Sequence, residues 1–415
     1  MSATARLRAN TVPLSTLDPE APLDDLEPLR AIVGEARVVA LGENSHFIAE
    51  FTHMRQRVLR FLTERCGFGV LAFEFGFSEG FALDAWARGE GAEADLGDRL
   101  AGSVPIGLDG PLRWMRRHNR TAAAPVAFAG IDIPAAGGSV LPALDPVIAY
   151  LREVDAESLP EAETAARIAA SFAGDSGAVA APAWAGLAAA EQDALTASLA
   201  RLLIRFRTLE PLYVARGGRE AYDVAVRRLE GACHADYTFK AMAGLFAGTG
   251  RTADTSARDA YMAGSVRWHL DRLGPGARIV LAAHNAHIQT EPISFGGRLT
   301  ALPMGHYLRA DLGGDYVPIA LTSVTGSTAE MRLDPAARFG FTVEDTPLDP
   351  PAPGSVEAEL PEGPVLTDLR KTRAEGTGGG PERIRLHGGY VETPVLSAFD
   401  GLISTGASTV DYPPT

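Results

Sequence analysis

Four short apolar runs, each ending in polar or ionisable residues, most strongly constrain what this chain can fold into. They occupy residues 37–43, 70–74, 126–132 and 278–284. Near-continuous apolar runs separated by helical segments are typical of buried parallel strands. The sequence therefore predicts an α/β fold with a mainly parallel central sheet flanked by helices. Two later strand-like runs, 316–327 and 397–406, are expected to extend this sheet.

The stretch between the third and fourth runs has a different composition. Residues 136–275 are rich in Ala, Leu and Arg at helical spacing, with almost no strand signal. This pattern predicts a large helical lobe inserted between strands, with residues 1–135 and 276–415 forming the α/β core. An insertion of this size lies over the strand ends, where it can form the cover of a cleft. A helical subdomain without a role in binding is the alternative.

Ionisable side chains follow the ends of all four predicted strands. In α/β folds, ligands bind beyond the carboxyl ends of parallel strands. We therefore expect a common site built from the residues found there, namely Glu43, His46, Glu74, Asp132, His284 and His287.

Two helices are expected to add arginines to this site. Arg55 lies at the margin of the apolar stripe of helix 49–65, where a guanidinium needs a carboxylate or ligand partner unless it reaches water along the surface. Ser256 and Asp259 have the spacing of a capping box at the start of another helix. Arg258 follows Ser256 and projects from the same side as Met262.

The stretch Gly76-Phe77-Ser78-Glu79-Gly80 fits the nucleophile elbow of α/β-hydrolases, with Ser78 as nucleophile. The preceding strand and the following helix suit this motif. However, a Ser78 triad leaves most of the charged strand-end residues without a role. We therefore interpret the stretch as a glycine-flanked turn that leads into a helix, and we expect the functional residue to be Glu74, at the end of the strand before it.

The histidines and acids support a second chemistry. His46 can take a proton from water while a carboxylate, with Glu74 as the candidate, orients its ring. His284 and His287 can bind a carbonyl and stabilise the oxyanion that develops on it. A third possibility is that the same side chains hold a divalent metal that supplies hydroxide, although their spacing matches no local metal motif.

Six segments, taken in order, resemble the motifs of the erythromycin esterase family. They are VVALGENSHFIAEF, VLAFEF, GIDIP, SARDAYMAGSVRWHL, ARIVLAAHNAHI and PMGHYL, found between about residues 36 and 310. The resemblance implies hydrolysis of an ester or macrolactone of a bulky, largely apolar small molecule by a water-activating histidine, with no covalent intermediate and no obligatory cofactor.

Carried over position by position, the resemblance makes His46 the general base, with Glu74, His284, His287 and Arg55 as its catalytic partners. We expect the substrate to be contacted by Glu43, Phe47, Asp132, Arg258, Met304 and His306. Phe47 departs from the family pattern, which often has a small residue after the first histidine. This departure suggests a reshaped pocket and leaves open a biosynthetic tailoring enzyme that cyclises or rearranges a natural-product intermediate.

Composition narrows the choice of partners. The 52 acidic and 38 basic residues give a formal net charge of −14, which disfavours nucleic acid and anionic membranes. No apolar stretch approaches the roughly 20 residues that span a bilayer, and the N-terminus has no secretory apolar region, so we expect a cytoplasmic protein. Its partner is then a small-molecule substrate. A binder of haem or a similar ligand remains a further alternative, and the oligomeric state stays open.

Overall fold

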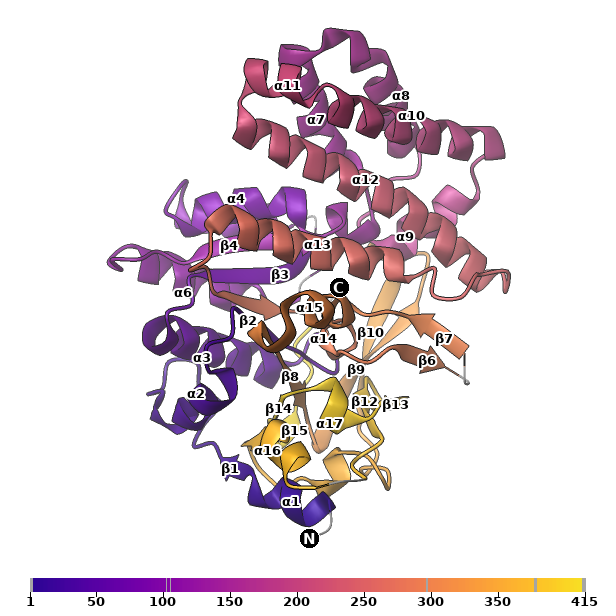
Figure 1. The fold of residues 1–415 in the computed structure, drawn as a ribbon. Helices are drawn as coiled ribbons and strands as arrows, with labels where there is room; N and C mark the ends of the chain where they lie inside the picture. Colours follow the sequence, from indigo (N-terminus) through magenta and orange to yellow (C-terminus); the bar gives the residue numbers. More distant parts are fainter. Residues whose placement is uncertain (1–2, 102, 105, 296–297, 377–378, 413–415) are drawn as a thin grey trace.

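The computed structural model describes residues 3–101, 103–104, 106–295, 298–376 and 379–412. Its centre is an eight-stranded sheet, which confirms the predicted α/β class (Figure 1). In spatial order the strands are β1 (Thr11–Pro13), β11 (Val365–Asp368), β14 (Gly401–Ser404), β8 (Tyr316–Thr322), β2 (Val38–Leu41), β5 (Ile279–Ala282), β3 (Val70–Gly76) and β4 (Ala127–Asp132). All neighbours from β14 to β4 are parallel, whereas β1 and β11 pair antiparallel at one edge.

The four apolar runs of the sequence are the adjacent strands β2, β5, β3 and β4. β2 is buried at every position because helices cover both faces of the sheet. Val39 and Leu41 pack on one face, and Val38 and Ala40 on the other. Since the four strands are parallel neighbours, their carboxyl ends meet at one edge of the sheet.

One face is covered by α2 (Glu27–Val33), α3 (Ala49–Cys66), α4 (Phe77–Ala87) and α6 (Asp109–Asn119). The other is covered by α13 (Ser256–Leu273), α15 (Met304–Leu312), α16 (Leu369–Ala374) and α17 (Val395–Ala398). The expected apolar stripe of α3 is fully buried. α3 ends at Cys66 and is capped by Gly67, whose φ of 74° lies in the left-handed region that suits glycine.

Strand β3 differs from its predicted length. It continues past Glu74 to Gly76, with a register irregularity between Phe73 and Gly76 where it pairs with β4. Helix α4 begins at Phe77, directly after the strand, so no separate turn is present. Glu74 therefore lies in the irregular part of the strand, which re-aims a side chain out of the regular alternation.

Between β4 and β5 the described chain is helical. The helices are α7 (Leu141–Val154), α8 (Leu159–Ala170), α9 (Gly177–Ala185), α10 (Ala189–Thr208), α11 (Glu210–Gly217), α12 (Arg219–Phe246) and α13. Helices α7, α8, α10 and α11 gather above the sheet in Figure 1, with α12 beneath them. They share an apolar core of their own. Helix α13 packs on the sheet through Met262, Val266 and Leu270, and contacts α12 through Tyr261.

Three small sheets complete the fold. Strands β9 (Thr325–Leu333) and β10 (Phe341–Pro347) form a hairpin that β15 (Ala407–Ser408) extends. The other two are the antiparallel pairs of β12 (Arg383–Leu386) with β13 (Gly389–Glu392) and of β6 (Ile293–Phe295) with β7 (Arg298–Ala301). Within the described residues, no helix has both the length and the apolar character needed to cross a membrane.

Candidate active site

The edge where β2, β5, β3 and β4 end brings most of the sequence-predicted site residues together. Bonds and ring contacts link Glu43, His46, Arg55, Glu74, Asp132, Arg258, His284 and His287 into one cluster. The cluster forms because parallel strands present their carboxyl ends at the same edge, while α3 and α13 begin beside it.

Glu43 is the carboxylate bonded to His46. Its Oε1 lies 2.8 Å from His46 Nδ1, and its Oε2 accepts from Arg55 Nη2 at 2.5 Å. Arg55 is 1% exposed, lies over the ring of Phe73 at 5.0 Å, and so finds the carboxylate partner expected at the margin of its helix stripe. An ionised carboxylate only accepts hydrogen bonds, so His46 carries its proton on Nδ1 and leaves Nε2 as a base.

Glu74 has other partners. Its Oε2 accepts from the backbone N–H of His284 at 2.9 Å, and its Oε1 accepts from Arg258 Nη2 at 2.9 Å. His287 Nε2 lies 3.4 Å from the same Oε1. The sequence suggested Glu74 as the carboxylate that orients His46, but in the structure Glu43 makes that hydrogen bond and Glu74 acts on His46 through its charge.

Arg258 joins two strand ends. Its Nε and Nη2 bond both oxygens of the fully buried Asp132, at 2.5–3.1 Å, while Nη2 also reaches Glu74. This bidentate geometry suits a guanidinium and fixes the start of α13 against β3 and β4. Arg258 and Asp132 therefore brace the site, since Nε and Nη2 of Arg258 are bonded to the two oxygens of Asp132 and to Glu74.

Asp259 was missed as a site residue. Its Oδ1 lies 2.7 Å from His287 Nδ1 and accepts from the backbone N–H of Met304 at 2.8 Å. The predicted capping box is wrong, because Ser256 Oγ instead accepts from Leu302 N. The signal that could have identified Asp259 is its place beside Arg258 in the quoted SARDAYMAGSVRWHL segment.

Among the described residues, one ring nitrogen of His284 has a hydrogen-bond partner and the other has none. Its Nδ1 accepts from the backbone N–H of Ala286 at 3.1 Å, so the neutral ring carries its proton on Nε2. That Nε2 is buried and has no hydrogen-bond partner among the described residues. The ring meets His46 edge-on, with the ring centres 5.3 Å apart. A buried, unused donor therefore lies beside a ring nitrogen able to accept a proton.

The three histidines differ in their proton affinity. Burial by itself lowers the pKa of His46, but the hydrogen bond to Glu43 and the charges of Glu43 and Glu74 outweigh it and raise the pKa. Burial also opposes protonation of His287, yet Asp259 and Glu74 raise its pKa to about 10. For His284, burial, followed by neighbouring His46 and His387, lowers the pKa to about 3.

The two carboxylates stay ionised. Burial favours their neutral forms, but the positive partners of each dominate. Arg55 and His46 lower the pKa of Glu43, while His287 and Arg258 hold the pKa of Glu74 well below its ordinary range.

Of the remaining predicted contact residues, Phe47 touches this network through the ring of His46, with ring centres 5.9 Å apart, and Met304 through its backbone N–H, which donates to Asp259. Phe47 packs into a small apolar cluster with Ala329 and Phe341, and its ring meets Tyr412 at 4.7 Å. Met304 is fully buried in the core under α15. His306 Nδ1 lies 3.0 Å from the carbonyl oxygen of Thr290.

Ser78 is the second residue of α4 and half-buried. No histidine of the described residues hydrogen-bonds to it. The strand-to-helix context of the motif is present, but the base that a serine nucleophile requires is not beside it.

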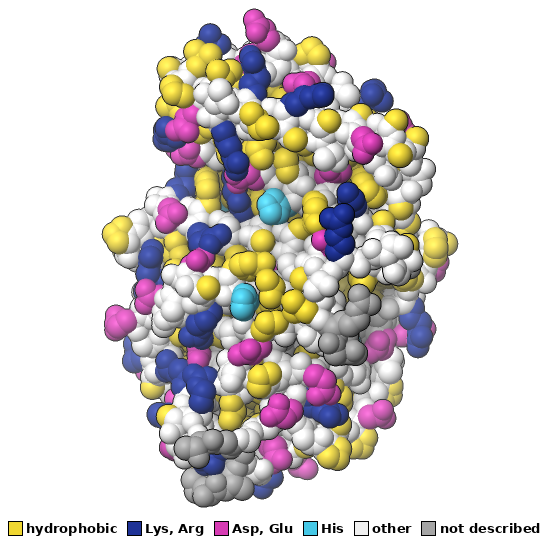
Figure 2. Space-filling model, turned by 45° about the vertical axis from the view of Figure 1, so that its right-hand side comes forward, with side chains coloured by type: hydrophobic (Ala, Val, Ile, Leu, Met, Phe, Trp, Pro, Cys, Tyr) yellow, Lys and Arg dark blue, Asp and Glu magenta, His cyan; other side chains and the backbone are white. Residues whose placement is uncertain are grey.

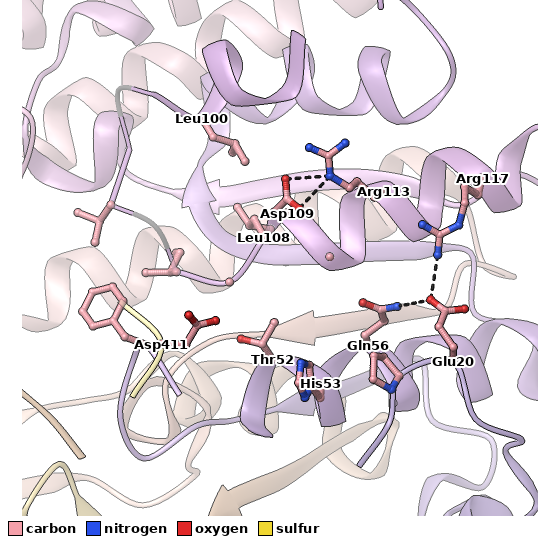
Figure 3. Close-up of a pocket in the computed structure, with 16 residues that line it drawn as sticks. Glu20, Thr52, His53, Gln56, Leu100, Leu108, Asp109, Arg113, Arg117 and Asp411 are labelled. Carbon is pink, nitrogen blue, oxygen red and sulfur yellow. Dashed lines mark hydrogen bonds and ion pairs between the residues drawn. The ribbon is translucent and has the colours of Figure 1, made fainter. Parts of the chain in front are cut away.

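A cleft of about 500 Å³ adjoins the cluster between α3 and α6 (Figure 3). Polar side chains from both helices line it, with ion pairs between Arg113 and Asp109 and between Arg117 and Glu20. Phe47, Val104 and Ile106 also line it. Val104 and Ile106 in addition line a small pocket that includes Glu74, so one short segment separates the cleft from the charged cluster.

The donor set of the site does not fit a metal ion. Among the described residues, no group of three His, Cys, Asp or Glu side chains has the arrangement of a metal site. Glu43 is already bonded to Arg55 and His46, and Glu74 to Arg258 and a backbone N–H. Both carboxylates are therefore neutralised by protein cations.

The chain is similar to known proteins over most of its length. The family model described as erythromycin esterase matches residues 63–407. An Escherichia coli erythromycin esterase type II is 37% identical over 402 residues, 96% of each chain, and a type I enzyme from the same species is 30% identical over 396 residues, 94% of this chain and 95% of its own. The solved structure of an erythromycin esterase EreC mutant in its open conformation superposes with a TM-score of 0.87 at 28% identity, covering 96% of this chain and 97% of that one.

Proposed function

Because the chain belongs to the erythromycin esterase family and is an esterase-like hydrolase, we propose that it hydrolyses the lactone ester of a macrolide-like molecule with water activated by His46. The pairing of His46 with His284 carries the proposal. His46 offers an unprotonated Nε2, while His284 offers an Nε2–H with no partner among the described residues. Their ring centres are 5.3 Å apart. Ester hydrolysis needs a base and an oxyanion donor side by side.

The reaction follows from these two nitrogens. His46 Nε2 takes a proton from water, and the oxygen attacks the ester carbonyl carbon. His284 Nε2–H donates to the oxygen on which negative charge develops. Protonated His46 is an imidazolium that Glu43 stabilises. As the ester C–O bond breaks, His46 gives its proton to the leaving alkoxide. The products are an acid and an alcohol, with one water added across the ester.

The low pKa of His284 suits this role. A ring that stays neutral at every pH of interest is a hydrogen-bond donor that does not lose its proton to His46. The raised pKa of His46 makes it the stronger base of the two. Their different environments thus assign the two roles.

The surroundings support a bulky, largely apolar substrate. The cleft beside the cluster is lined by apolar residues from the 100–108 segment as well as by polar ones. Figure 2 shows hydrophobic side chains gathered across the middle of one face, while charges of both signs are scattered around them. Pockets for small molecules combine mainly apolar walls with a few polar groups.

Mass spectrometry of the protein incubated with erythromycin tests the proposal. We expect a product heavier than the substrate by one water, formed at the same rate after treatment with a chelator. A product of unchanged mass would instead indicate a rearranging or cyclising enzyme. Activity that is lost on chelation and restored by one metal would overturn the metal-free mechanism, and a haem absorption band in the purified protein would favour a binder.

A further inference from the structure

The turn of the β12–β13 hairpin has an unusual residue at its first position. Leu386 pairs with Gly389, so His387 and Gly388 form a two-residue turn. His387 has a φ of 51°, in the left-handed region that residues with a side chain rarely occupy. Glycine is favoured at such turn positions. Strained residues of this kind are found at functional sites, so the side chain at 387 needs an explanation.

The turn is bonded to the loop that carries the candidate base. The backbone N–H of His387 donates to the carbonyl oxygen of Asn44 at 2.8 Å, and that of Gly388 donates to Glu330 Oε1 at 2.8 Å. Asn44 lies between Glu43 and His46 in the sequence. The hairpin therefore has a fixed position against the site.

The side chain of His387 faces the histidine cluster. Its ring stacks on that of His284, with centres 5.5 Å apart and planes 29° apart. Its Nδ1 lies 3.3 Å from Ser45 Oγ. Since the hydroxyl hydrogen of Ser45 is donated to the carbonyl oxygen of His46, His387 is the donor in this contact. Ser45 also accepts from Thr328 Oγ1, which ties β9 to the same network.

We propose that His387 is a positioning residue, which holds the ring of His284 so that Nε2–H is directed at the developing oxyanion. Among the described residues, the ring of His284 has one hydrogen bond, from the backbone N–H of Ala286. The edge of His46 and the face of His387 supply the two contacts that restrict its rotation. This inference rests on the proposed function, since it assigns His284 the oxyanion-donor role.

A further observation supports a neutral positioning ring. Burial, followed by the charge of His46, lowers the pKa of His387, although Glu330 and Glu43 oppose this. A protonated ring at this point would place a second cation beside His46 and reduce its basicity. The neutral ring supplies shape and its hydrogen bonds to Ser45 and to the backbone of Ala329 without that effect.

Glycine at position 387 is the informative variant, because it removes the ring and also relieves the left-handed strain. We expect His387→Gly to keep or raise the melting temperature and to lower kcat about tenfold or more with KM nearly unchanged, since small misplacements cost up to about 10²-fold. His387→Phe, which retains a flat ring, is expected to recover part of the lost rate. Ala253→Gly is the matched control, because Ala253 has a φ of 57° outside the site. It should raise stability without changing kcat.

A measurement on the protein without substrate tests the positioning role of His387 separately from the proposed function. In protein labelled with ¹⁵N-histidine, NMR of the wild type should show His284 neutral with its proton on Nε2. His387→Gly should shift or broaden these signals, and Ala253→Gly should not. A wild type that leaves macrolides intact refutes the proposed function alone. Wild-type kcat in His387→Gly, an unchanged His284 spectrum, or no recovery with phenylalanine would each overturn the positioning role.

Discussion

Two carboxylate–histidine groups lie side by side in this site, and they differ in how many acids each histidine contacts. His46 has one bonded carboxylate, Glu43, whose charge is shared with Arg55. His287 lies between two, Asp259 and Glu74. Glu43 and Glu74 raise the pKa of His46, and Asp259 and Glu74 raise that of His287 to about 10.

The difference teaches that proximity to an acid does not by itself make a histidine a base. A base must exchange its proton near the working pH, and a ring held between two carboxylates stays protonated there. His287 is therefore better suited as a fixed cation that neutralises Glu74 than as a proton shuttle. His46, with one shared carboxylate, can be both charged and neutral during turnover.

Removing the base should have the largest effect. We expect His46→Ala to lower kcat by up to about 10⁴-fold, the upper range for general-base catalysis, with an unchanged melting temperature. Rates of erythromycin hydrolysis and thermal unfolding curves measure the two quantities. Retention of the full rate would contradict the assignment of His46 as the base.

Glu74→Gln should come next, with a loss of about 10²–10³-fold in kcat. An amide offers one acceptor oxygen, but Glu74 uses both of its oxygens to accept from His284 N–H and Arg258. The substitution also removes the negative charge of Glu74, which partly neutralises the two cations Arg258 and His287. The test is to measure kcat and KM of Glu74→Gln in parallel with those of His46→Ala. An unchanged kcat would show that Glu74 has no part in catalysis.

Glu43→Gln should cost less, about 10–10²-fold, because the Glu43 carboxylate is bonded to two side chains and, among the described residues, to no backbone N–H. The clearest result of Glu43→Gln should be a shift in the pH profile of kcat/KM. Glu43 raises the pKa of His46, so loss of its charge lowers that pKa. Since neutral His46 is the active form, the acidic limb of the kcat/KM profile should move to lower pH. A limb that moves to higher pH, or not at all, would contradict the pairing.

Substitution of His287 should change the free energy of unfolding more than it changes kcat. A pKa raised to about 10 means that its contribution to folding is fully present below the unfolded value of about 6.5 and is lost as pH rises toward 10. His287→Gln should therefore reduce the free energy of unfolding most at pH 6 and least near pH 10, as urea titrations would show. A loss of kcat as large as that of His46→Ala would instead make His287 a base.

Much of the fold could be predicted from the sequence, and so could most of the residues that form the cluster at the carboxyl edge of the sheet. Buried parallel strands have a local signature, and their shared edge follows from parallel pairing. The partners within the cluster could not be predicted. Glu74 lies in a strand irregularity and bonds to the His284 N–H and to Arg258 rather than to His46, and Asp259 bonds to a histidine 28 residues later. His387 comes from a hairpin turn in a glycine-rich stretch, where local sequence shows neither register nor neighbours.

The smallest effect is expected for Ser78→Ala, within about twofold of the wild-type kcat, because this half-buried serine lies away from the chemistry. Ser78 follows Glu74 by four residues, and its motif matches a nucleophile elbow. However, it starts a helix with no histidine of the described residues bonded to it, whereas Glu74 contacts two cations and the backbone of His284. Measured together, Ser78→Ala and Glu74→Gln separate covalent from water-mediated hydrolysis. A large loss for serine with a small loss for glutamate would require an acyl-enzyme, which mass spectrometry of the protein during turnover would then detect.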